Sequence, residues 1–369
     1  MHCLRFSRMP AGRPARSAQG GAALIVALLV FALCTALVVA MELEFSRFYQ
    51  RGANILLAEQ ANAYLRGAED LATLALLADH DADRNRDRPR DDLQEIWAQT
   101  PVPYALDEGG WMVGCLRDLQ GRFNLNSLAT RVTPAEGAPQ FTPAQAQFIR
   151  LLQALEEPQL GEPEAISITE AVGDWLDRDL EPAMDGAEDD YYVGQTPAYR
   201  AANRPMASVS ELRAVANMTP EIYRALEPWV SVWPQQPAPL NIHTAPATVL
   251  RSINADGELS PLSAAEAEAL VEQRRTVGFA DLDDFLASAV FAGRQGQMEA
   301  VKPLLGEATS YFLLSAEVEV ADRRMRLYSV LQRSGRQVSA IARASGSLDD
   351  SQPYRGEQDS CTIAPSLDW

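Results

Sequence analysis

The chain has 369 residues, enough for two domains beyond an anchor, and its 32 basic and 50 acidic side chains give a formal net charge of −18. Such acidity argues against nucleic acid and anionic lipid as partners, because both would repel the chain. The 3 histidines and 4 cysteines lack zinc-ligand spacing, and the sequence has no nucleophile–base motif or phosphate loop, so we do not expect an enzyme.

The N-terminal region carries an unbroken apolar run from Ala22 to Met41 that contains no charged side chain. A helix of this length, rising about 1.5 Å per residue, spans roughly 30 Å, the thickness of one hydrocarbon core. Arginines precede the run, and glutamates follow it at once. By the positive-inside rule, the leader stays in the cytoplasm and the rest of the chain lies across the membrane.

A glycine pair, Gly20-Gly21, separates the basic leader from the apolar run. An ordinary secretory signal is cut after its apolar region. A cut behind this pair instead leaves the apolar helix on the mature chain, with Ala22 as its first residue. This order of features resembles a type IV prepilin or pseudopilin. A signal anchor that is never cut is the alternative.

Helical periodicity continues from Glu42 to Leu77, a stretch without proline. It predicts one very long helix, half in the bilayer and half packed on a globular domain that covers its apolar stripe. The charged run from Asp79 to Asp92 is expected to be a solvated loop. Short strands are predicted at 110–116 and 122–125.

From about Thr133 to Leu305 the chain has helical periodicity and is rich in Ala, Leu, Glu and Pro. Start signals such as Thr-Pro pairs and a capping box indicate several helices. They begin near Thr142, Ser167, Ser208, Thr219, Thr244 and Ser263. The pattern then returns to strands at 311–320, 324–333 and 337–345.

These elements predict an α+β, pilin-like fold. A long N-terminal helix packs on a small antiparallel sheet, and a large all-α domain is inserted between the strands. The expected parts are a leader (1–21), a transmembrane part (22–41), the rest of the helix with the first strands (42–132), the inserted α-domain (133–305), the remaining strands (306–345) and a flexible C-terminal tail (346–369).

The cysteines suggest one covalent link. Cys3 leaves with the leader and Cys34 lies in the membrane run, so Cys115 and Cys361 remain in an oxidising compartment. A disulfide between them would tie the C-terminal tail to the core. The alternative is that both are free cysteines, which are common as small core residues.

Six short motifs follow one another along the chain. They are FNLN (123–126), GDWLD (173–177), EDDYY (188–192), ANRP (202–205), SEL (210–212) and LNIHTA (240–245). Behind a prepilin-type leader, this succession resembles the minor pseudopilin K (GspK) family of bacterial type II secretion systems over almost the whole chain. The resemblance implies a structural assembly protein with an α-domain.

The resemblance also implies how the chain matures and with what it assembles. A prepilin peptidase would cut after Gly21, and the same enzyme would methylate Ala22. The subunit, anchored once in the bacterial inner membrane with its bulk in the periplasm, would join minor pseudopilins I and J at the tip of a fibre, the pseudopilus. A pilus-like minor pilin for DNA uptake or adhesion is the alternative, which the acidity disfavours.

The fifth residue of the mature helix bears on the tip position. Most pilins carry a glutamate there, which neutralises the terminal amine of the subunit above, whereas this chain has Val26. A carboxylate without a partner in hydrocarbon costs several kcal/mol. A subunit with nothing stacked above it therefore prefers an apolar residue, although an ordinary membrane-helix residue would look the same.

One segment concentrates carboxylates that could bind a cation. Its candidate ligands are Asp174, Asp177, Asp179, Glu188, Asp189 and Asp190. Such oxygen ligands suit Ca²⁺, although the spacing is not that of an EF-hand. The resemblance implies calcium in this domain. A solvated acidic loop with Arg178 as local partner is the alternative.

The run 240–286 is similar to a helix-hairpin-helix unit of the kind that binds the DNA backbone. Such units place basic side chains on phosphates. Here the hairpin equivalent, Asn254 to Glu258, is acidic, as are its surroundings. We therefore expect this segment to be packing scaffold or a protein-binding surface.

Overall fold

A computed structural model describes residues 20–84, 89–107, 109–130, 140–321 and 323–345. Most of the expected leader and all of the expected C-terminal tail lie outside these ranges. The chain divides into two compact units, one ending at Glu59 and the other beginning at Gln60.

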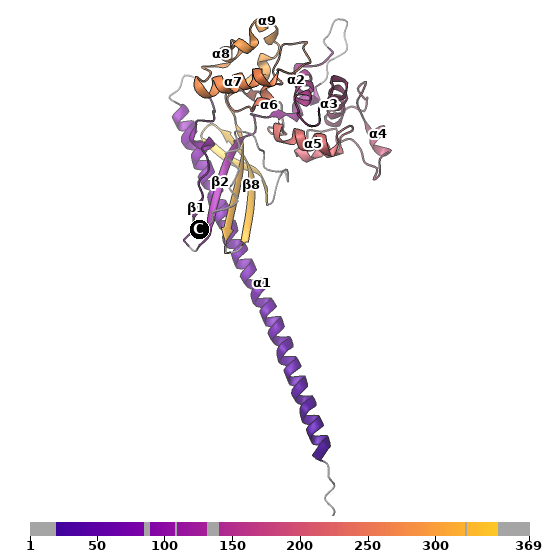
Figure 1. Ribbon diagram of the computed structural model, residues 1–369, viewed down its shortest axis with the longest axis vertical. Coiled ribbons are helices and arrows are strands. Elements are labelled where there is room, and N and C mark those ends of the chain that lie inside the picture. Colours follow the sequence, from indigo (N-terminus) through magenta and orange to yellow (C-terminus); the bar gives the residue numbers. More distant parts are fainter. Residues whose placement is uncertain (1–19, 85–88, 108, 131–139, 322, 346–369) are drawn as a thin grey trace, which may run out of the picture. The chain divides into compact units, whose positions relative to one another are not determined.

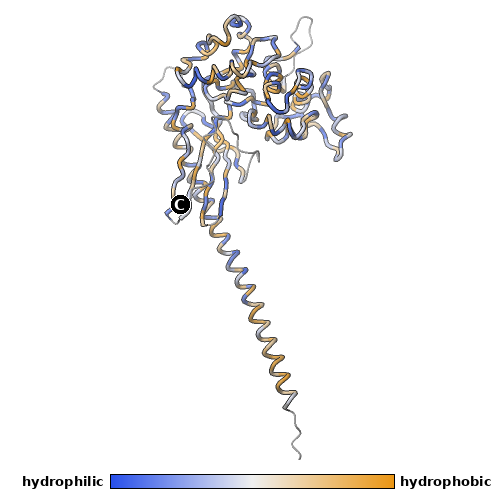
Figure 2. Tube along the Cα trace, in the orientation of Figure 1, coloured by the Kyte–Doolittle hydropathy of each residue, from blue (hydrophilic) through white to orange (hydrophobic). Residues whose placement is uncertain are grey.

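Helix α1 runs from Gly20 to Asp83, as the unbroken periodicity predicts. Its first half is the apolar run, which appears orange in Figure 2, and the large apolar side chains of this half are exposed. Among the described residues, α1 is the one helix long and apolar enough to cross a membrane, with a mean hydropathy of 3.0 over its most apolar window. This unit is consistent with a membrane anchor.

In the second unit, α1 buries one stripe of side chains against a sheet. The stripe has the three- and four-residue spacing of a helix face. It consists of Ala61, Leu65, Ala68, Ala72 and Leu76. The helix lies close to the strands, since a Cβ built on Gly114 of the sheet would be 3.9 Å from the side chain of Ala68. Burying each leucine of the stripe contributes about 2 kcal/mol to stability.

Five antiparallel strands form this sheet, in the order β1-β2-β7-β8-β9 (Figure 1). Their bounds are Tyr104–Ala105 for β1, Trp111–Asp118 for β2, Tyr311–Val320 for β7, Arg323–Ser334 for β8 and Gln337–Ala344 for β9. The long predicted strands are thus confirmed. Because β2 pairs with β7, the chain between them leaves the sheet and returns to it.

The intervening chain, which we call the helical segment (residues 119–310), holds eight of the described α-helices. They are α2 (Pro143–Gln153), α3 (Glu162–Leu176), α4 (Asp189–Val193), α5 (Pro220–Leu226), α6 (Ala247–Leu250), α7 (Ala264–Thr276), α8 (Leu282–Leu286) and α9 (Gln295–Met298). The segment also holds the 3₁₀ helices η2 (Leu125–Ala129), η3 (Val209–Ala214), η4 (Glu227–Trp229), η5 (Ala289–Phe291) and η6 (Lys302–Leu304), and η1 (Ile96–Ala98) precedes it.

The prediction of a purely helical insert is wrong in detail. Strand β3 (Phe123–Asn124) pairs in parallel with β4 (Val230–Ser231), and β5 (Leu240–Asn241) pairs in parallel with β6 (Leu305–Gly306). These pairs connect the ends of the segment to its middle. The predicted strand at 122–125 therefore belongs to the helical segment and not to the main sheet.

The capping signals begin helices where they were predicted. The side chain of Thr142 accepts from the Gln145 amide at 3.2 Å, and the side chain of Gln145 accepts from the Thr142 amide at 2.9 Å. Ser263 caps α7 in the same way with Glu266. The Ser208 box caps a 3₁₀ helix, η3, and α3 begins before the predicted Ser167.

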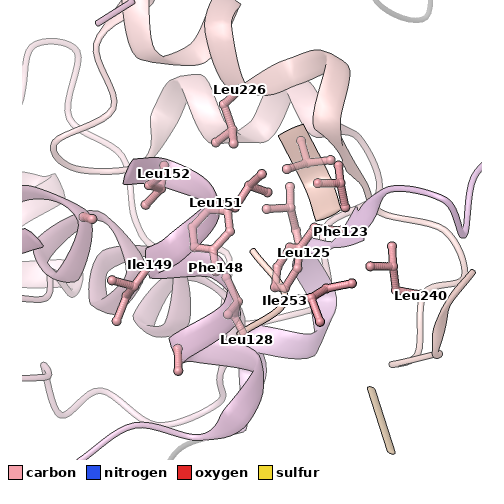
Figure 3. Close-up of a cluster of buried hydrophobic side chains, with 14 of the residues drawn as sticks. Phe123, Leu125, Leu128, Phe148, Ile149, Leu151, Leu152, Leu226, Leu240 and Ile253 are labelled. Carbon is pink, nitrogen blue, oxygen red and sulfur yellow. The ribbon is translucent and has the colours of Figure 1, made fainter. Parts of the chain in front are cut away.

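A hydrophobic core holds the helical segment together and extends from Phe123 to Leu305. Figure 3 shows side chains from η2, α2, α5 and β5 meeting in it. Phe123 and Phe148 stack with ring centroids 5.1 Å apart. The segment thus has its own interior, separate from the face of α1 that covers the sheet.

The charged run after α1 corrects a prediction. We expected a solvated loop from Asp79 to Asp92, but α1 continues to Asp83, and Asp79 and Asp91 are only 4% and 1% exposed. The side chains pair with Arg333 on β8 instead of facing water. Residues 85–88 of the run lie outside the described ranges.

Candidate functional site

The predicted processing residues lie at the start of α1. Gly21 and Ala22 are helical and exposed, and no atom lies within 4 Å of a Cβ built on Gly21. Val26 is also exposed, in the middle of the apolar surface of the first unit. The basic residues before Gly20 are outside the described chain.

Within the second unit, the face of α1 opposite the sheet is apolar too. Leu71 and Leu74 are 59% and 61% exposed, although large apolar side chains usually lie inside a domain. Ala63, Gly67 and Ala78 lie along the same side at helical spacing, and a Cβ on Gly67 would meet nothing within 4 Å. We call this set, Ala63, Gly67, Leu71, Leu74 and Ala78, the outer stripe.

Three of the six predicted metal ligands come together. One carboxylate oxygen each from Asp177, Asp179 and Glu188 lie within 4.8 Å of one another. Asp177 directly follows α3, and Glu188 directly precedes α4, so these two carboxylates meet where the loop between the helices begins and ends. Asp177 and Glu188 are buried, while Asp179 is exposed. This acidic loop could hold a metal ion, because only hard oxygen ligands meet there at spacing that a Ca²⁺ shell tolerates.

The other predicted ligands have different contacts. Asp174 is fully buried on α3, and its carboxylate accepts from the Ala183 amide at 3.1 and 3.3 Å. Asp189 accepts from the Ala201 amide at 3.1 Å and lies 3.6 Å from Arg200, and Asp190 is exposed. Asp174 therefore shapes the loop from inside, and Asp189 fastens the chain that follows it.

The ANRP and SEL motifs support the same loop. Asn203 donates to the Asp179 carbonyl at 3.1 Å from its side chain and to the Trp175 carbonyl at 3.0 Å from its backbone. Its φ of 46° is one that asparagine tolerates better than most residues. Glu211 accepts from the Ala207 amide at 2.7 Å and caps η3. These motifs thus hold the backbone around the acidic loop.

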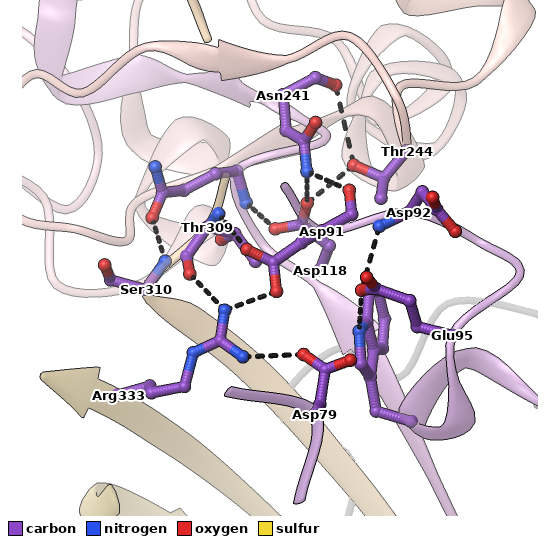
Figure 4. A network of polar contacts seen from close by, with 12 residues as sticks. Asp79, Asp91, Asp92, Glu95, Asp118, Asn241, Thr244, Thr309, Ser310 and Arg333 are labelled. Atoms are coloured by element: carbon purple, nitrogen blue, oxygen red, sulfur yellow. Dashed lines mark hydrogen bonds and ion pairs between the residues drawn. The ribbon is translucent and has the colours of Figure 1, made fainter. Parts of the chain in front are cut away.

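A second polar cluster was not predicted. Figure 4 shows Arg333 of β8 between Asp79 of α1 and Asp91 of the chain after α1. Its guanidinium lies 2.8 Å from Asp79, pairs with Asp91, and donates to the Thr309 carbonyl at 3.1 Å. The ring of Phe312 lies beneath it, with its centroid 5.0 Å from the guanidinium carbon.

The LNIHTA motif completes this cluster. Asn241 donates to the Asp118 carboxylate at 3.0 Å and to the Asp91 carbonyl at 2.9 Å, and Thr244 donates to Asp118 at 2.5 Å. Since Asp118 ends β2, these bonds fasten the helical segment to the sheet. We call Asp79, Asp91, Glu95, Asp118, Arg333, Asn241 and Thr244 the polar junction.

Burial dominates the electrostatics of the polar junction. It raises the pKa of Asp79 to about 6 and that of Asp91 to about 7, and it also raises the pKa of Glu95 and of Asp118. Burial lowers the pKa of Arg333, but the charges of Asp91 and Asp79 outweigh this effect and raise it. Asp79 and Asp91 are therefore poised to take up protons near neutral pH.

The segment that resembles a helix-hairpin-helix unit uses its arginines internally. Arg274 on α7 is buried and donates to the carbonyls of Ile242 and Ala245, at 3.1 and 2.6 Å. Burial lowers its pKa to about 10. Arg251 donates to the carbonyls of Leu262 and Ala154 at 3.0 and 2.7 Å. These cations hold backbone together, which agrees with a packing scaffold and not with a phosphate-binding surface.

The predicted cysteine pair is described at one end only. Cys115 is buried on β2, whereas Cys361 lies outside the described residues. Cys34 is exposed on α1 within the apolar run.

Comparison with known proteins gives a consistent result. A family model described as type II secretion system (T2SS) protein K matches residues 121–235, and a second model with this description matches residues 240–305. The chain is 37% identical over 325 residues to the type II secretion system protein K of Pseudomonas aeruginosa, covering 86% of this chain and 90% of that protein. It is 31% identical over 331 residues to the type II secretion system protein K of Klebsiella pneumoniae, covering 89% and 97% of the two chains.

A solved structure is similar as well. The crystal structure of the GspK-GspI-GspJ complex from the type 2 secretion system of enterotoxigenic Escherichia coli contains a chain that matches with a TM-score of 0.68 and 28% identity. The match covers 80% of the present chain and 99% of that one. The similarity thus includes the fold of most of the described residues.

Proposed function

Because the chain belongs to the type II secretion system protein K (GspK) family, and is a structural pseudopilin and not an enzyme, we propose that it completes the tip of a periplasmic fibre, the pseudopilus. There it works with minor pseudopilins I and J and supports export of folded proteins across the outer membrane. The observation that carries this proposal is 37% identity over 86% of the chain to a type II secretion protein K.

The order of the basic leader, the apolar run and the remaining residues along the chain supports a placement in the inner membrane. The apolar half of α1 is the anchor, the basic leader faces the cytoplasm, and the residues after the anchor lie in the periplasm. Prepilin peptidase cuts after Gly21 and methylates Ala22, so the anchor stays on the mature subunit. Val26, at the fifth mature position, suits a subunit with no neighbour stacked above it.

The outer stripe is the surface that we assign to minor pseudopilins I and J. It lies on the side of α1 that the sheet does not cover, where Leu71 and Leu74 are exposed. An apolar helix from a neighbouring subunit can pack against Leu71 and Leu74, and Gly67 permits close approach of its backbone.

Calcium is the cofactor we propose for the acidic loop. Asp177, Asp179 and Glu188 supply the ligands, and Asp174 and Asp189 hold the surrounding backbone. The ion would offset the repulsion among these carboxylates and fix the two ends of the loop.

We further propose a disulfide between Cys115 and Cys361, which mass spectrometry of a non-reduced digest would detect as one linked peptide pair.

The direct test of the proposed function is assembly followed by secretion. Full-length protein should co-purify with pseudopilins I and J in detergent, and it should restore secretion to a host that lacks its own gene. An adhesive or DNA-uptake pilin would instead restore adhesion or transformation and leave secretion absent. That result, together with a failure to bind I and J, would contradict the proposal.

A further inference from the structure

The polar junction concentrates carboxylates around one ion-pair partner. Asp79 and Asp91, both buried, share the guanidinium of Arg333, and the buried carboxylates of Glu95 and Asp118 lie close to this pair. Oxygens of Asp79, Asp91 and Glu95 lie within 4.8 Å of one another. Like charges at this distance in a buried site raise each other's cost of ionisation, so Asp79 and Asp91 compete for the one guanidinium that they share.

Not all of the carboxylates are equally able to stay ionised. Asp118 accepts bonds from Asn241, Thr244 and the Gln120 amide, the last at 2.6 Å, and these donors favour its charged form. Glu95 accepts from the Trp97 indole at 2.9 Å and the Asp92 amide at 3.1 Å.

Asp91 and Asp79 depend mainly on Arg333. Asp91 accepts from the Thr309 amide at 2.7 Å and shares Arg333 with Asp79. A proton on one carboxyl of this pair lets the other keep the full ion pair.

The position of the pair makes its protonation structurally important. Asp79 lies near the end of α1, Arg333 lies near the end of β8, Thr309 precedes β7, and Asn241 lies on β5 of the helical segment. The bonds of Asp91 reach Arg333 and Thr309 through its side chain and Asn241 through its carbonyl. A change at Asp91 therefore acts on the attachment of the helical segment to the sheet.

We propose that the polar junction is a proton-dependent latch, which holds the helical segment on the sheet while one carboxyl of the Asp79–Asp91 pair is protonated and loosens when that proton leaves. The elevated pKa of Asp91, about 7, and of Asp79, about 6, agree with this geometry. The inference is independent of the proposed function, because it concerns only the stability of the second unit, which contains the sheet and the helical segment.

The sign of the pH dependence follows from proton linkage. A carboxyl with a raised folded pKa binds its proton more tightly in the folded chain than in the unfolded chain. The stabilisation is present in full below the unfolded pKa, near 4, and is lost as pH rises through the folded values of about 6 and 7. The free energy of unfolding of the second unit should thus fall between pH 6 and pH 8.

Other titratable groups face this site and must be separated from it. Asp83 lies on α1 near Asp79, and Asp92 pairs with Arg90 at 3.1 Å beside Glu95. His243, two residues from Asn241, acts in the opposite direction, because burial lowers its pKa to about 4. The test therefore compares the pH dependence of variants and not that of one protein alone.

The experiment measures the melting temperature of the full chain in detergent at pH 6 and pH 8. Asp91→Asn mimics the protonated carboxyl, so it should raise the melting temperature at pH 8 by roughly 3–6 °C relative to wild type and leave pH 6 nearly unchanged. Asp79→Asn should have a smaller effect with the same sign. Glu299→Gln, at an exposed carboxyl of the helical segment, is the control and should leave the pH dependence as it is.

Two further measurements do not depend on a variant folding. Infrared spectra of the wild type should contain a protonated-carboxyl band at pH 6 that disappears by pH 8. Amide hydrogen exchange at Thr309, corrected for the intrinsic effect of pH, should accelerate over the same interval. Equal pH dependence in wild type and Asp91→Asn, or the absence of the carboxyl band at pH 6, would overturn the latch.

Discussion

At the scale of residues, the acidic loop separates ligands from supports. Asp177 and Glu188 belong to the group whose oxygens meet, whereas Asp190 is exposed and outside it. An ion that binds only the folded chain stabilises it by about 2.7 kcal/mol at 100 times its Kd. Asp177→Asn and Glu188→Gln should lose most of this calcium-dependent rise in melting temperature.

Asp190→Asn is the control for that prediction, and it should keep the rise found for the wild type. Thermal melts with calcium and with a chelator measure the effect. If the wild type melts at the same temperature in both solutions, the calcium proposal fails. If Asp177→Asn and Glu188→Gln respond like the wild type, the ligands have been assigned to the wrong carboxylates.

Gly186 tests the supporting role of Asp174. A Cβ at Gly186 would lie 2.0 Å from Oδ2 of Asp174, so an alanine would displace the carboxylate from the Ala183 amide. We expect Gly186→Ala to destabilise the chain by about 1–3 kcal/mol and to weaken calcium binding. Gly296→Ala, where nothing lies within 4 Å, should be nearly neutral in the same denaturant titration. Equal stabilities for the two variants would show that Asp174 tolerates the displacement.

Individual residues were also the hardest feature to predict from the sequence. The motif that contains Asn241 and Thr244 was recognised, but nothing in it indicates that Asp118 is the partner. Asp79 and Asp91 stand in a run of mixed charge, which normally signals solvent. Their burial depends on Arg333, far along the chain, and a long-range ion pair leaves no periodic pattern in the sequence.

At the scale of elements, α1 has two apolar faces, one buried against the sheet and the other exposed. Leu65 is 2% exposed against the sheet, whereas Leu71 is 59% exposed on the outer stripe. Leu65→Ala should lower the free energy of unfolding by roughly 2–4 kcal/mol, because it leaves a cavity beneath the helix. Denaturant unfolding of the full chain in detergent measures this loss.

Leu71→Glu, in contrast to Leu65→Ala, should impair assembly and leave stability nearly unchanged. The side chain already faces solvent, so stability should change by less than about 0.5 kcal/mol. Co-purification with pseudopilins I and J should fall at least tenfold, since a charge would then enter an apolar helix contact. Asp70→Asn, at the exposed neighbouring position, should retain both properties. Full assembly by Leu71→Glu would remove the outer stripe from the interface.

Elements with a repeating pattern were predictable, and those without one were not. The strand-like run 311–320 and the helix-start signals at Thr142 and Ser263 correctly located β7, α2 and α7. The pairs β3–β4 and β5–β6 have two residues in each strand, too few for a period, and their partners are far apart in sequence. A purely helical insert was therefore the natural but mistaken prediction.

At the scale of the whole molecule, the protein has an apolar anchor and a second unit that is stabilised by its own internal contacts. Arg274 and Arg251 of the helical segment donate to backbone carbonyls, and the outer stripe and the anchor are the apolar surfaces that we propose for contacts with other subunits. The anchor was predictable, because twenty consecutive apolar residues leave few alternatives to a transmembrane helix. The way in which the helical segment is fastened to the sheet was not, since it depends on polar contacts across the fold.

The most direct measurement is the intact mass of the protein isolated from its host. Every assembly step proposed here requires that the apolar part of α1 remains on the mature subunit. The expected mass corresponds to a chain that begins at Ala22 and carries one added methyl group. A mature chain that begins after Met41 would contradict the account, because it would have lost the anchor.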